Sequence, residues 1–380
     1  MDMRHNPRKP VFVVVFNGRL EDGCDYATQT IRLLARTGHV YGWCLGEPIS
    51  WRTTFSCRAL PIIEKRFGVI IFRPVFLIPG QRNYFIRITN YAVNAVALSI
   101  YIALIHPHAK KFFWFFEPFY MPTLLRIFFP YVTIFDCVDY FFAFPYPFVN
   151  HLLFSLQRST YVFVNSFTLR RQIQRYRSDA TVVPLGFSSA GYKRKEIMKE
   201  TRHQIFRVGF IGGIDDRLDY QLLFQVATAL PDIEFMFVGR NYYVSTGFPP
   251  RAQSFFSLAN VRHREEVAKS LIPTVLTTFD IGIIPYNIKQ SFNRFCFPMK
   301  TLEYFFAGLP VVSTNIEEIR KYRDLIAIVN TPQEMIGEIN KIKKYGLSKK
   351  KRLKAQRTAL NNSWVKKINT IEKVIFSDPR

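Results

Sequence analysis

The sequence has few cysteines, and their arrangement excludes two kinds of stabilisation. They are odd in number and include no Cys-x-x-Cys pair: Cys24, Cys44, Cys57, Cys137 and Cys296. This pattern argues against a disulfide framework and against a structural zinc site, and it is typical of a protein kept in a reducing compartment. The apolar run 11–16 that follows the basic start is too short for a signal-peptide core. We therefore expect a cytoplasmic protein.

Acidic residues are also scarce. The chain has 28 Asp and Glu against 52 Lys and Arg, which gives a net charge of +24. Such a surplus favours anionic partners such as phosphates, nucleic acid or lipid headgroups, without choosing among them. It is uneven, because residues 341–367 carry eleven Lys or Arg and no acid. Since no nucleic-acid-binding motif is recognised, we do not expect nucleic acid as a partner.

Long apolar stretches are rare, and only residues 88–105 need to be weighed as a membrane span. These 18 residues carry no charge, which is the lower limit of length for crossing a bilayer. Thr89, Asn90, Asn94 and Ser99 dilute the run, and a strand-like segment follows at Lys111–Phe116, the spacing of an α/β unit. We interpret 88–105 as a buried helix, with a membrane span as the alternative.

Short continuous apolar runs alternate with helical patterns along the chain. Continuous apolarity predicts parallel sheets that are covered on both faces, and 380 residues suit two domains better than one. The expected strands are Val11–Phe16, Val69–Phe72, Phe112–Phe116, Val132–Phe135, Tyr161–Asn165 and Thr181–Val183, then Phe206–Ile211, Ile233–Val238, Ile281–Ile284 and Pro310–Ser313. The sequence therefore predicts an α/β fold of two Rossmann-like domains facing a cleft.

Composition sets the domain limits. We expect an N-terminal, acceptor-side Rossmann-like domain at 1–186, a linker rich in Gly, Ser and Lys at 187–205, and a C-terminal Rossmann-like domain at 206–345. Apolar residues then recur at helical steps: Leu353, Leu360, Trp364, Ile368, Ile371 and Ile375. This period predicts a basic amphipathic helix within 346–380 that packs back across the protein with its basic face outward.

The first candidate binding motif follows the strand Phe206–Ile211. Gly212 and Gly213 turn the chain, and Arg217 stands where the next helix begins. Loop glycines at the end of a strand let the backbone approach a ligand, and the guanidinium fork of Arg suits a diphosphate. The alternative is an ordinary Gly-Gly turn. Asp215 and Asp216 favour a helix N-terminus more than a metal site.

The second motif is longer and runs from Pro298 to Ser313. Pro298 opens a helix, Gly308 with Pro310 ends it, and Lys300 and Glu303 lie three apart on one face. Such a pair is most often an exposed ion pair. The functional alternative is that the Lys300 ammonium meets a phosphate while the Glu303 carboxylate accepts hydrogen bonds from two ribose hydroxyls.

The pattern Pro-x-Lys-x-x-Glu-Tyr-x-x-Ala-Gly-x-Pro-Val-Val at 298–312 resembles the donor-site signature of GT-B-fold glycosyltransferases related to families 1 and 4. Segments of the first half, such as 135–139 and 182–186, resemble the other domain of that fold. The resemblance implies transfer of a sugar from a nucleotide-diphosphate sugar to a glycan or lipid-linked acceptor. It implies that Glu303 binds the ribose and that Arg217 and Lys300 neutralise the diphosphate, so that neither a metal nor a cofactor is required.

The resemblance places backbone amides of Gly212 and Gly213 near the diphosphate and includes Pro298 in the donor site. For the other domain we name Glu117 and Asp139, each at the end of an expected strand, as candidate catalytic residues. Asn17 and Gly18, which follow the first strand, are acceptor-side candidates.

The chain departs from the family pattern at two informative positions. Phe295 stands where many retaining relatives carry a donor-contacting Glu, and Phe116 stands where relatives often have His before Glu-Pro. A catalytically degenerate protein that binds a sugar nucleotide or anionic lipid is therefore the alternative function. A nucleotide-sugar oxidoreductase or epimerase is disfavoured, because neither Gly-x-Gly-x-x-Gly nor a Tyr-x-x-x-Lys pair stands out.

Thirteen phenylalanines fall between Phe112 and Phe154, and most must be core by number alone. Some can line a hydrophobic acceptor groove. Together with the basic segment near the end of the chain, they motivate the hypothesis of a lipid-linked acceptor at an anionic membrane surface. The alternative is that the basic segment is a solvent-exposed, lysine-rich helix face that binds no membrane.

Overall fold

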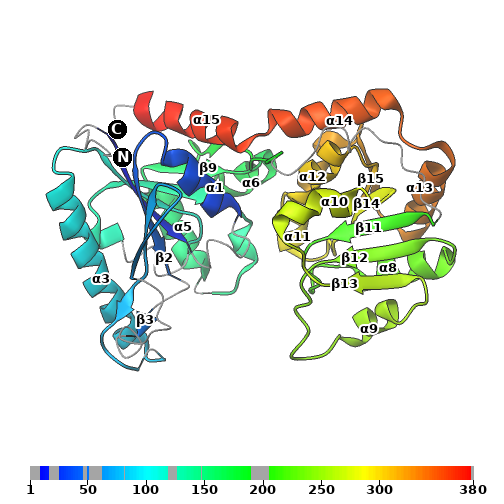
Figure 1. Ribbon diagram of the computed structural model, residues 1–380, viewed down its shortest axis with the longest axis horizontal. Coiled ribbons are helices and arrows are strands. Elements are labelled where there is room, and N and C mark those ends of the chain that lie inside the picture. The colour runs from blue at the N-terminus through cyan, green and yellow to red at the C-terminus, as the bar shows by residue number, and fades with distance from the viewer. Residues whose placement is uncertain are drawn as a thin grey trace. The chain divides into compact units, whose positions relative to one another are not determined.

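The apolar runs of the sequence become the strands of two parallel sheets in a computed structural model (Figure 1). The chain forms two compact units, Met1–Leu185 with Trp364–Arg380, and Gly186–Ser363. The structure describes residues 9–16, 25–45, 49–50, 62–80, 82–118, 126–146, 148–189 and 205–377. Asn17, Gly18 and most of the expected linker lie outside these ranges.

The N-terminal unit is built on an eight-stranded sheet in the order β10-β9-β8-β7-β1-β2-β5-β4. Its strands are parallel except β4, which runs antiparallel to β5. Central β1 is buried along its whole length, because β7 and β2 flank it. The strands are β1 Val11–Phe16, β2 His39–Cys44, β4 Ile63–Arg66, β5 Val69–Phe72, β7 Lys111–Phe115, β8 Val132–Cys137, β9 Tyr161–Val164 and β10 Thr181–Val182; β3 Ile49–Ser50 pairs separately with β6 Val75–Phe76.

Aromatic side chains fill the core of this unit. Phe12 stacks on Phe112 at 5.0 Å between ring centroids, and Phe115 stacks on Phe135 at 5.0 Å, each pair joining neighbouring strands. Of the twelve phenylalanines between 112 and 154 that the structure describes, seven are buried, and most of these lie in or next to strands β7 and β8. The helices are α1 Asp25–Leu34, α3 Tyr84–Ile105, α5 Phe148–Arg158, α6 Phe167–Ile173 and α15 Trp364–Ser377, with short 3-10 turns η1 Arg126–Phe128 and η2 Phe141–Ala143.

The C-terminal unit has a six-stranded parallel sheet in the order β13-β12-β11-β14-β15-β16. Its strands are β11 Arg207–Ile211, β12 Glu234–Val238, β13 Val261–Arg264, β14 Ile281–Ile284, β15 Val311–Thr314 and β16 Ile326–Val329. The helices are α8 Tyr220–Ala229, α9 Pro250–Phe256, α10 Ile272–Leu276, α11 Ser291–Phe295, α12 Lys300–Ala307, α13 Pro332–Tyr345 and α14 Lys349–Asn361, with η3 Lys269–Leu271 and η4 Glu317–Tyr322. The predicted pair of Rossmann-like domains is thus confirmed.

The expectation of one basic helix near the end needs correction. The segment forms two helices, α14 and α15, which separate at Asn362–Ser363 and belong to different units. The break coincides with pairing of the chain to another segment, because Phe187 N donates to Asn362 O at 2.6 Å. Only α15 buries the predicted apolar residues, whereas α14 packs through Ala355 and Ala359 and leaves Leu360 exposed.

Helix α15 is held in the N-terminal unit by a buried ion pair. The Lys367 Nζ lies 3.0 Å from Asp136 Oδ1 and 2.8 Å from Oδ2, and both side chains are fully buried. Asp136 comes from central strand β8, so the pair ties the end of the chain to the middle of the sheet. Lys367 is therefore not part of an outward basic face, as the charge pattern predicted.

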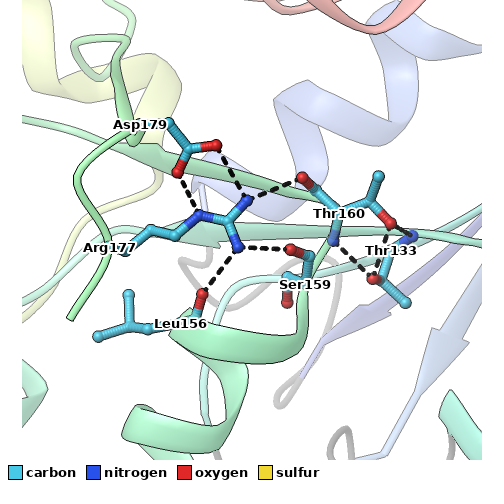
Figure 2. Close-up of polar contacts among 6 residues, drawn as sticks. All are labelled: Thr133, Leu156, Ser159, Thr160, Arg177 and Asp179. Atoms are coloured by element: carbon cyan, nitrogen blue, oxygen red, sulfur yellow. Dashed lines mark hydrogen bonds and ion pairs between the residues drawn. The ribbon is translucent and has the colours of Figure 1, made fainter. Parts of the chain in front are cut away.

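A second polar cluster lies near β9 and β10, at one edge of the same sheet (Figure 2). The Arg177 guanidinium donates to Leu156 O at 3.1 Å and to Ser159 O at 2.9 Å, carbonyls at the end of α5 that the helix itself cannot satisfy. It also donates to Thr160 O and pairs with Asp179. The planar, five-donor guanidinium suits this fan of acceptors, which a lysine cannot match. Arg177 therefore fixes where α5 ends and β9 begins.

Candidate functional site

The turn after β11 brings backbone close to a buried cation. Gly212 has φ +134°, and a Cβ there would lie 2.6 Å from Lys300 Nζ, so a side chain is excluded on both counts. Gly212 N already donates to Val238 O at 2.9 Å. Within the described part of the chain, the Gly213 amide makes no backbone hydrogen bond. Of the two amides predicted to approach a diphosphate, only that of Gly213 is thus available.

Helix α12 is pinned to the end of this strand by Tyr304. The Ile211 amide donates to the Tyr304 hydroxyl at 3.1 Å, and that hydroxyl faces Ile283 O on β14 at 3.4 Å. The helix ends at Gly308 in the left-handed conformation, φ 74°, as the sequence pattern predicts. Buried Pro298 lies just before the helix and accepts a hydrogen bond from Thr301 N. These contacts fix the first turn of α12, which carries Lys300 and Glu303.

Lys300 is the most unusual residue of the site. It is only 8% exposed, and its Nζ lies 3.6 Å from the ring centroid of Phe210 and 5.0 Å from that of Tyr286. Burial, reinforced by the charge of Arg217, lowers its pKa to about 7, against the opposing effect of Asp215 and Glu303. The ring faces offset part of the cost of burying the ammonium. An anion bound here would restore the charge.

Arg217 is held beside Lys300 by aromatic and amide groups. Its guanidinium carbon lies 4.4 Å from the Tyr286 ring centroid and 5.1 Å from that of Phe292. Its Nε donates to Asn293 Oδ1 at 3.0 Å, and the buried Asn293 amide donates back to Arg217 O at 3.1 Å. The side chain is therefore oriented before any ligand arrives, which reduces the entropy lost on binding.

The aspartates near the turn act differently from the expectation. The side chain that caps α8 is Asp219, which accepts from Leu222 N, whereas Asp215 Oδ1 accepts from Arg217 N at 3.1 Å. Asp215 thus shapes the turn instead of favouring the helix N-terminus. Its pKa is raised, chiefly by burial, while the nearby cations Arg217 and Lys300 oppose the shift.

The structure brings Gly212, Gly213, Arg217 and Lys300 together at the carboxyl end of β11. Glu303 is half-buried one turn along α12 and interacts electrostatically with Lys300. Sequence reasoning assigned no role to the residues that hold the cations, which are Phe210, Tyr286, Phe292 and Asn293. Each is a common aromatic or amide residue, and none carries a local sequence signal for its contact with a cation.

Glu117 and Asp139 belong to the N-terminal unit. They follow β7 and β8, which pair in parallel register with Phe115 opposite Phe135, so both residues lie at the same edge of the sheet. Glu117 Oε1 accepts a hydrogen bond from the Tyr26 hydroxyl at 2.9 Å. Asp139 is half-buried, and its carbonyl accepts from Phe141 N. Phe295 ends α11 and is half-buried.

Comparison with known proteins agrees with this geometry. The sequence model of the family described as "Glycosyl transferases group 1" matches residues 205–344. A Bacillus subtilis (strain 168) protein, provisionally assigned as the teichuronic acid biosynthesis glycosyltransferase TuaH, is 36% identical over 115 residues. That match covers 30% of this chain and 28% of TuaH, so it spans less than a third of the relative.

Solved structures extend the likeness to the whole fold. Sucrose-phosphate synthase from Thermosynechococcus elongatus superimposes with a TM-score of 0.71 at 13% identity, covering 97% of this chain and 99% of the other. Anabaena HepE in complex with UDP and glucose gives 0.70 at 13% identity, covering 97% and 100%. The family match is thus confined to residues 205–344, while the structural similarities show that the whole chain has the two-domain GT-B fold of these glycosyltransferases.

Proposed function

We propose that the protein transfers a sugar from a nucleotide-diphosphate sugar to a glycan or lipid-linked acceptor without needing a metal ion. The observation that carries the proposal is the pair of cations, Lys300 and Arg217, oriented beside the Gly212–Gly213 turn. The pKa of the buried Lys300 ammonium is lowered to about 7, which means that its charge destabilises the folded protein while the site is empty. A bound anion would stabilise that charge, and this supports an anionic ligand.

Each residue has a role in this proposal. Lys300 and Arg217 stabilise the negative charge that grows on the diphosphate as the sugar–phosphate bond breaks, and the Gly213 amide donates to a phosphate oxygen. Glu303 accepts hydrogen bonds from the two ribose hydroxyls. Because two fixed cations balance the leaving diphosphate, the chemistry at this site requires neither a metal nor a further cofactor. UDP in the HepE complex supports a nucleoside diphosphate as the ligand class.

Substitution of Glu303 by alanine tests the donor site. We expect UDP, GDP or ADP to raise the melting temperature of the wild type, and the effective nucleotide to bind about 100-fold more weakly to the Glu303→Ala variant, since two charge-assisted hydrogen bonds are lost. A thermal-shift titration measures both. Glu338→Ala, which removes a half-buried glutamate of α13 paired with Lys341, is the matched control and should keep the full response. An undiminished response in Glu303→Ala would contradict the assignment.

For the acceptor side we propose Glu117 and Asp139 as the catalytic residues. A general base contributes typically 10²- to 10⁴-fold, so Glu117→Gln or Asp139→Asn should lower the turnover number by about that factor. Release of nucleoside diphosphate from the donor that gives the thermal shift measures turnover, including slow hydrolysis. The thermal shift itself should stay, because the donor site lies in the other unit. If both variants turn over like the wild type, neither residue is the base.

The same assay separates the enzyme from a degenerate binding protein. Phe295 on α11 is the position that motivates this alternative, because an apolar ring replaces a carboxylate there. A protein that gives the thermal shift but releases no nucleoside diphosphate, with or without acceptor, would be a binding protein.

A further inference from the structure

Helix α3 exposes an apolar surface along its length. Phe85 is 76% exposed and Leu104 is 75% exposed, at opposite ends of the helix. From Val93 onward the exposed residues recur at steps of three or four, and Phe85 lies eight residues before Val93 on the same side of the helix. They form one stripe: Phe85, Val93, Val96, Ile100 and Leu104, with Tyr101 and Ile105 beside them. The interpretation of 88–105 as a buried helix therefore holds for only one face.

The buried face of α3 carries two asparagines, Asn90 and Asn94, among Tyr91, Ala95, Leu98 and Ile102. The Asn94 side chain accepts from Val75 N at 2.9 Å and donates to Val75 O at 2.7 Å. Asn90 makes the same two bonds to Ile78, at 3.0 and 2.9 Å. Four hydrogen bonds to the backbone fix how the helix is rotated about its axis. The apolar stripe therefore points outward, so α3 carries apolar side chains on its exposed face as well as on its buried face, unlike an ordinary surface helix of a protein in water.

Neighbouring segments enlarge this apolar surface. Leu77 and Ile78 are exposed in the segment that the asparagines bind, and Ile127 is exposed on η1, which packs against α3. A contiguous apolar surface of this size marks an interaction site more often than an accident of composition.

Cationic groups border the stripe, whereas the helix itself has no acidic residue. Arg82 and Arg87 lie at its N-terminal end, and Lys110 and Lys111 follow its C-terminal end. Arg126 on η1 does not add to these cations, because its guanidinium is turned toward α5, where it donates to Arg158 O at 2.9 Å and lies 5.2 Å from the Phe154 ring centroid. An apolar stripe bordered by cations is the pattern of a helix that lies in the interface of an anionic bilayer.

We propose that the α3 stripe binds an anionic lipid bilayer, with the helix parallel to the membrane plane and its apolar side chains in the headgroup–acyl boundary. Twenty-two residues give a stripe about 33 Å long at 1.5 Å per residue. An apolar stripe of this length fits the planar surface of a bilayer. The proposal is independent of the transferase activity, because membrane binding requires no sugar nucleotide.

The helix does not cross the bilayer in this proposal. Among the described residues, α3 is the single helix long and apolar enough to span one by length and composition. Its Asn90 and Asn94 bonds and the Tyr91 hydroxyl, which donates to Leu45 O at 3.0 Å, bind it to the rest of the unit. Inserting the helix across a membrane would break these bonds in a medium that cannot replace them. Figure 1 shows α3 alongside the N-terminal sheet at the left of the view.

A second copy of the chain fits this surface less well than lipid does. Two copies meeting through α3 would bring the arginines and lysines at its ends near those of the partner, and each chain carries a net charge of +24. Like charges brought together oppose association. Anionic headgroups instead attract and neutralise the same cations.

Vesicle co-sedimentation of the full chain tests the proposal. The wild type should sediment with vesicles of phosphatidylcholine mixed with phosphatidylglycerol, and much less with phosphatidylcholine alone. The double variant Ile100→Gln with Leu104→Gln should bind the mixed vesicles at least about ten-fold more weakly, because two large apolar side chains no longer leave water. Glutamine is a good helix former, so the helix and the melting temperature should be preserved.

The matched control removes similar apolar surface elsewhere. Val244 is 78% exposed and Tyr345 is 73% exposed, both in the C-terminal unit. The double variant Val244→Gln with Tyr345→Gln should bind vesicles like the wild type. A tryptophan introduced by Leu104→Trp should be quenched by brominated lipid, which reports contact with acyl chains.

Three results would overturn the proposal. The first is a wild type that does not sediment with the mixed vesicles, and the second is an Ile100→Gln, Leu104→Gln variant that sediments as fully as the wild type. The third is a wild-type dimer, seen by light scattering, that the same variant converts to a monomer without any vesicle binding. That result would make the stripe an interface between copies.

Discussion

Replacing Lys300 with methionine is expected to make the free protein more stable at low pH while removing its response to a nucleoside diphosphate. In the empty site the ammonium is buried against Phe210 and beside the like charge of Arg217, so it opposes folding. Methionine has a similar length and no charge, and it fills the same space. The proposed donor site loses one of its two cations. Stability and function should therefore change in opposite directions.

The pH dependence follows from the sign of the pKa shift. The pKa of Lys300 falls from its ordinary value of 10.5 to about 7 in the folded protein. Below pH 7 the folded protein carries the full cost of the buried charge. Between pH 7 and 10.5 the unfolded chain binds more protons than the folded one, so this lysine makes stability rise with pH. The advantage of Lys300→Met should thus be largest below pH 7 and disappear toward 10.5.

Urea unfolding at about pH 6 and about pH 9 measures the difference in unfolding free energy between Lys300→Met and the wild type. In thermal unfolding at the lower pH, the melting temperature of Lys300→Met should exceed that of the wild type by about 3 °C or more. Lys341→Met, which removes an exposed lysine of the same unit, should show no such pH-dependent gain. A Lys300→Met variant that is less stable than the wild type at both pH values would show that the ammonium is a structural contact.

Nucleotide binding gives an independent measure of the same charge. Because a bound diphosphate raises the pKa of Lys300, binding at about pH 8 should take up close to one proton per nucleotide. Calorimetry in buffers of different ionisation enthalpy counts these protons. The uptake should persist in Lys341→Met, which keeps the proposed phosphate site intact. Proton-neutral binding to the wild type would contradict the assignment of Lys300 to the phosphate site.

Removing Lys367 is expected to destabilise the N-terminal unit by about 3 to 5 kcal/mol, because Asp136 is left charged and fully buried without its partner. Burial raises the pKa of Asp136, and Lys367 is the group that opposes the shift. The Lys367→Met variant should unfold at lower urea concentration. Hydrogen exchange of the α15 amides should accelerate with it, since the helix loses its tie to β8.

A second substitution separates the loss of the pair from the loss of packing. Asp136→Leu combined with Lys367→Met replaces the ion pair by apolar groups, and it should recover most of the stability that Lys367→Met loses, since no uncompensated charge remains. Lys373→Met on the exposed side of α15 is the control and should stay close to the wild type. A double variant as unstable as Lys367→Met would mean that the cost comes from packing and not from the stranded carboxylate.

Most strands that form a continuous apolar run could be predicted from the sequence, whereas strands that contain glycine, histidine or charged residues were missed. Val11–Phe16 and Ile281–Ile284 were predicted with their limits, because a continuous apolar run identifies such strands. Strands β2 and β13 were missed. His39–Cys44 contains a glycine and a histidine, and Val261–Arg264 at the sheet edge alternates with charged residues, so neither carries that pattern.

The donor motif itself was determined by the sequence. Pro298 and Gly308 set the limits of α12, and the spacing of three places Lys300 and Glu303 on one face of it. The contacts of this face of α12 depend on residues that are distant in the sequence. Phe210 and Tyr286 bury the ammonium, and nothing local to α12 distinguishes a buried lysine from an exposed one.

The same limit explains the two largest departures from expectation. Lys367 lies at the end of a basic run, and only its contact with Asp136, 231 residues away, makes it a core residue. In α3 the apolar period shows which side chains share a face, but the backbone groups of Val75 and Ile78 bind Asn90 and Asn94 and so turn that face to solvent. Sequence periodicity thus determined the elements and their faces, and tertiary structure alone decided what each face contacts, because contact free energy depends on both partners.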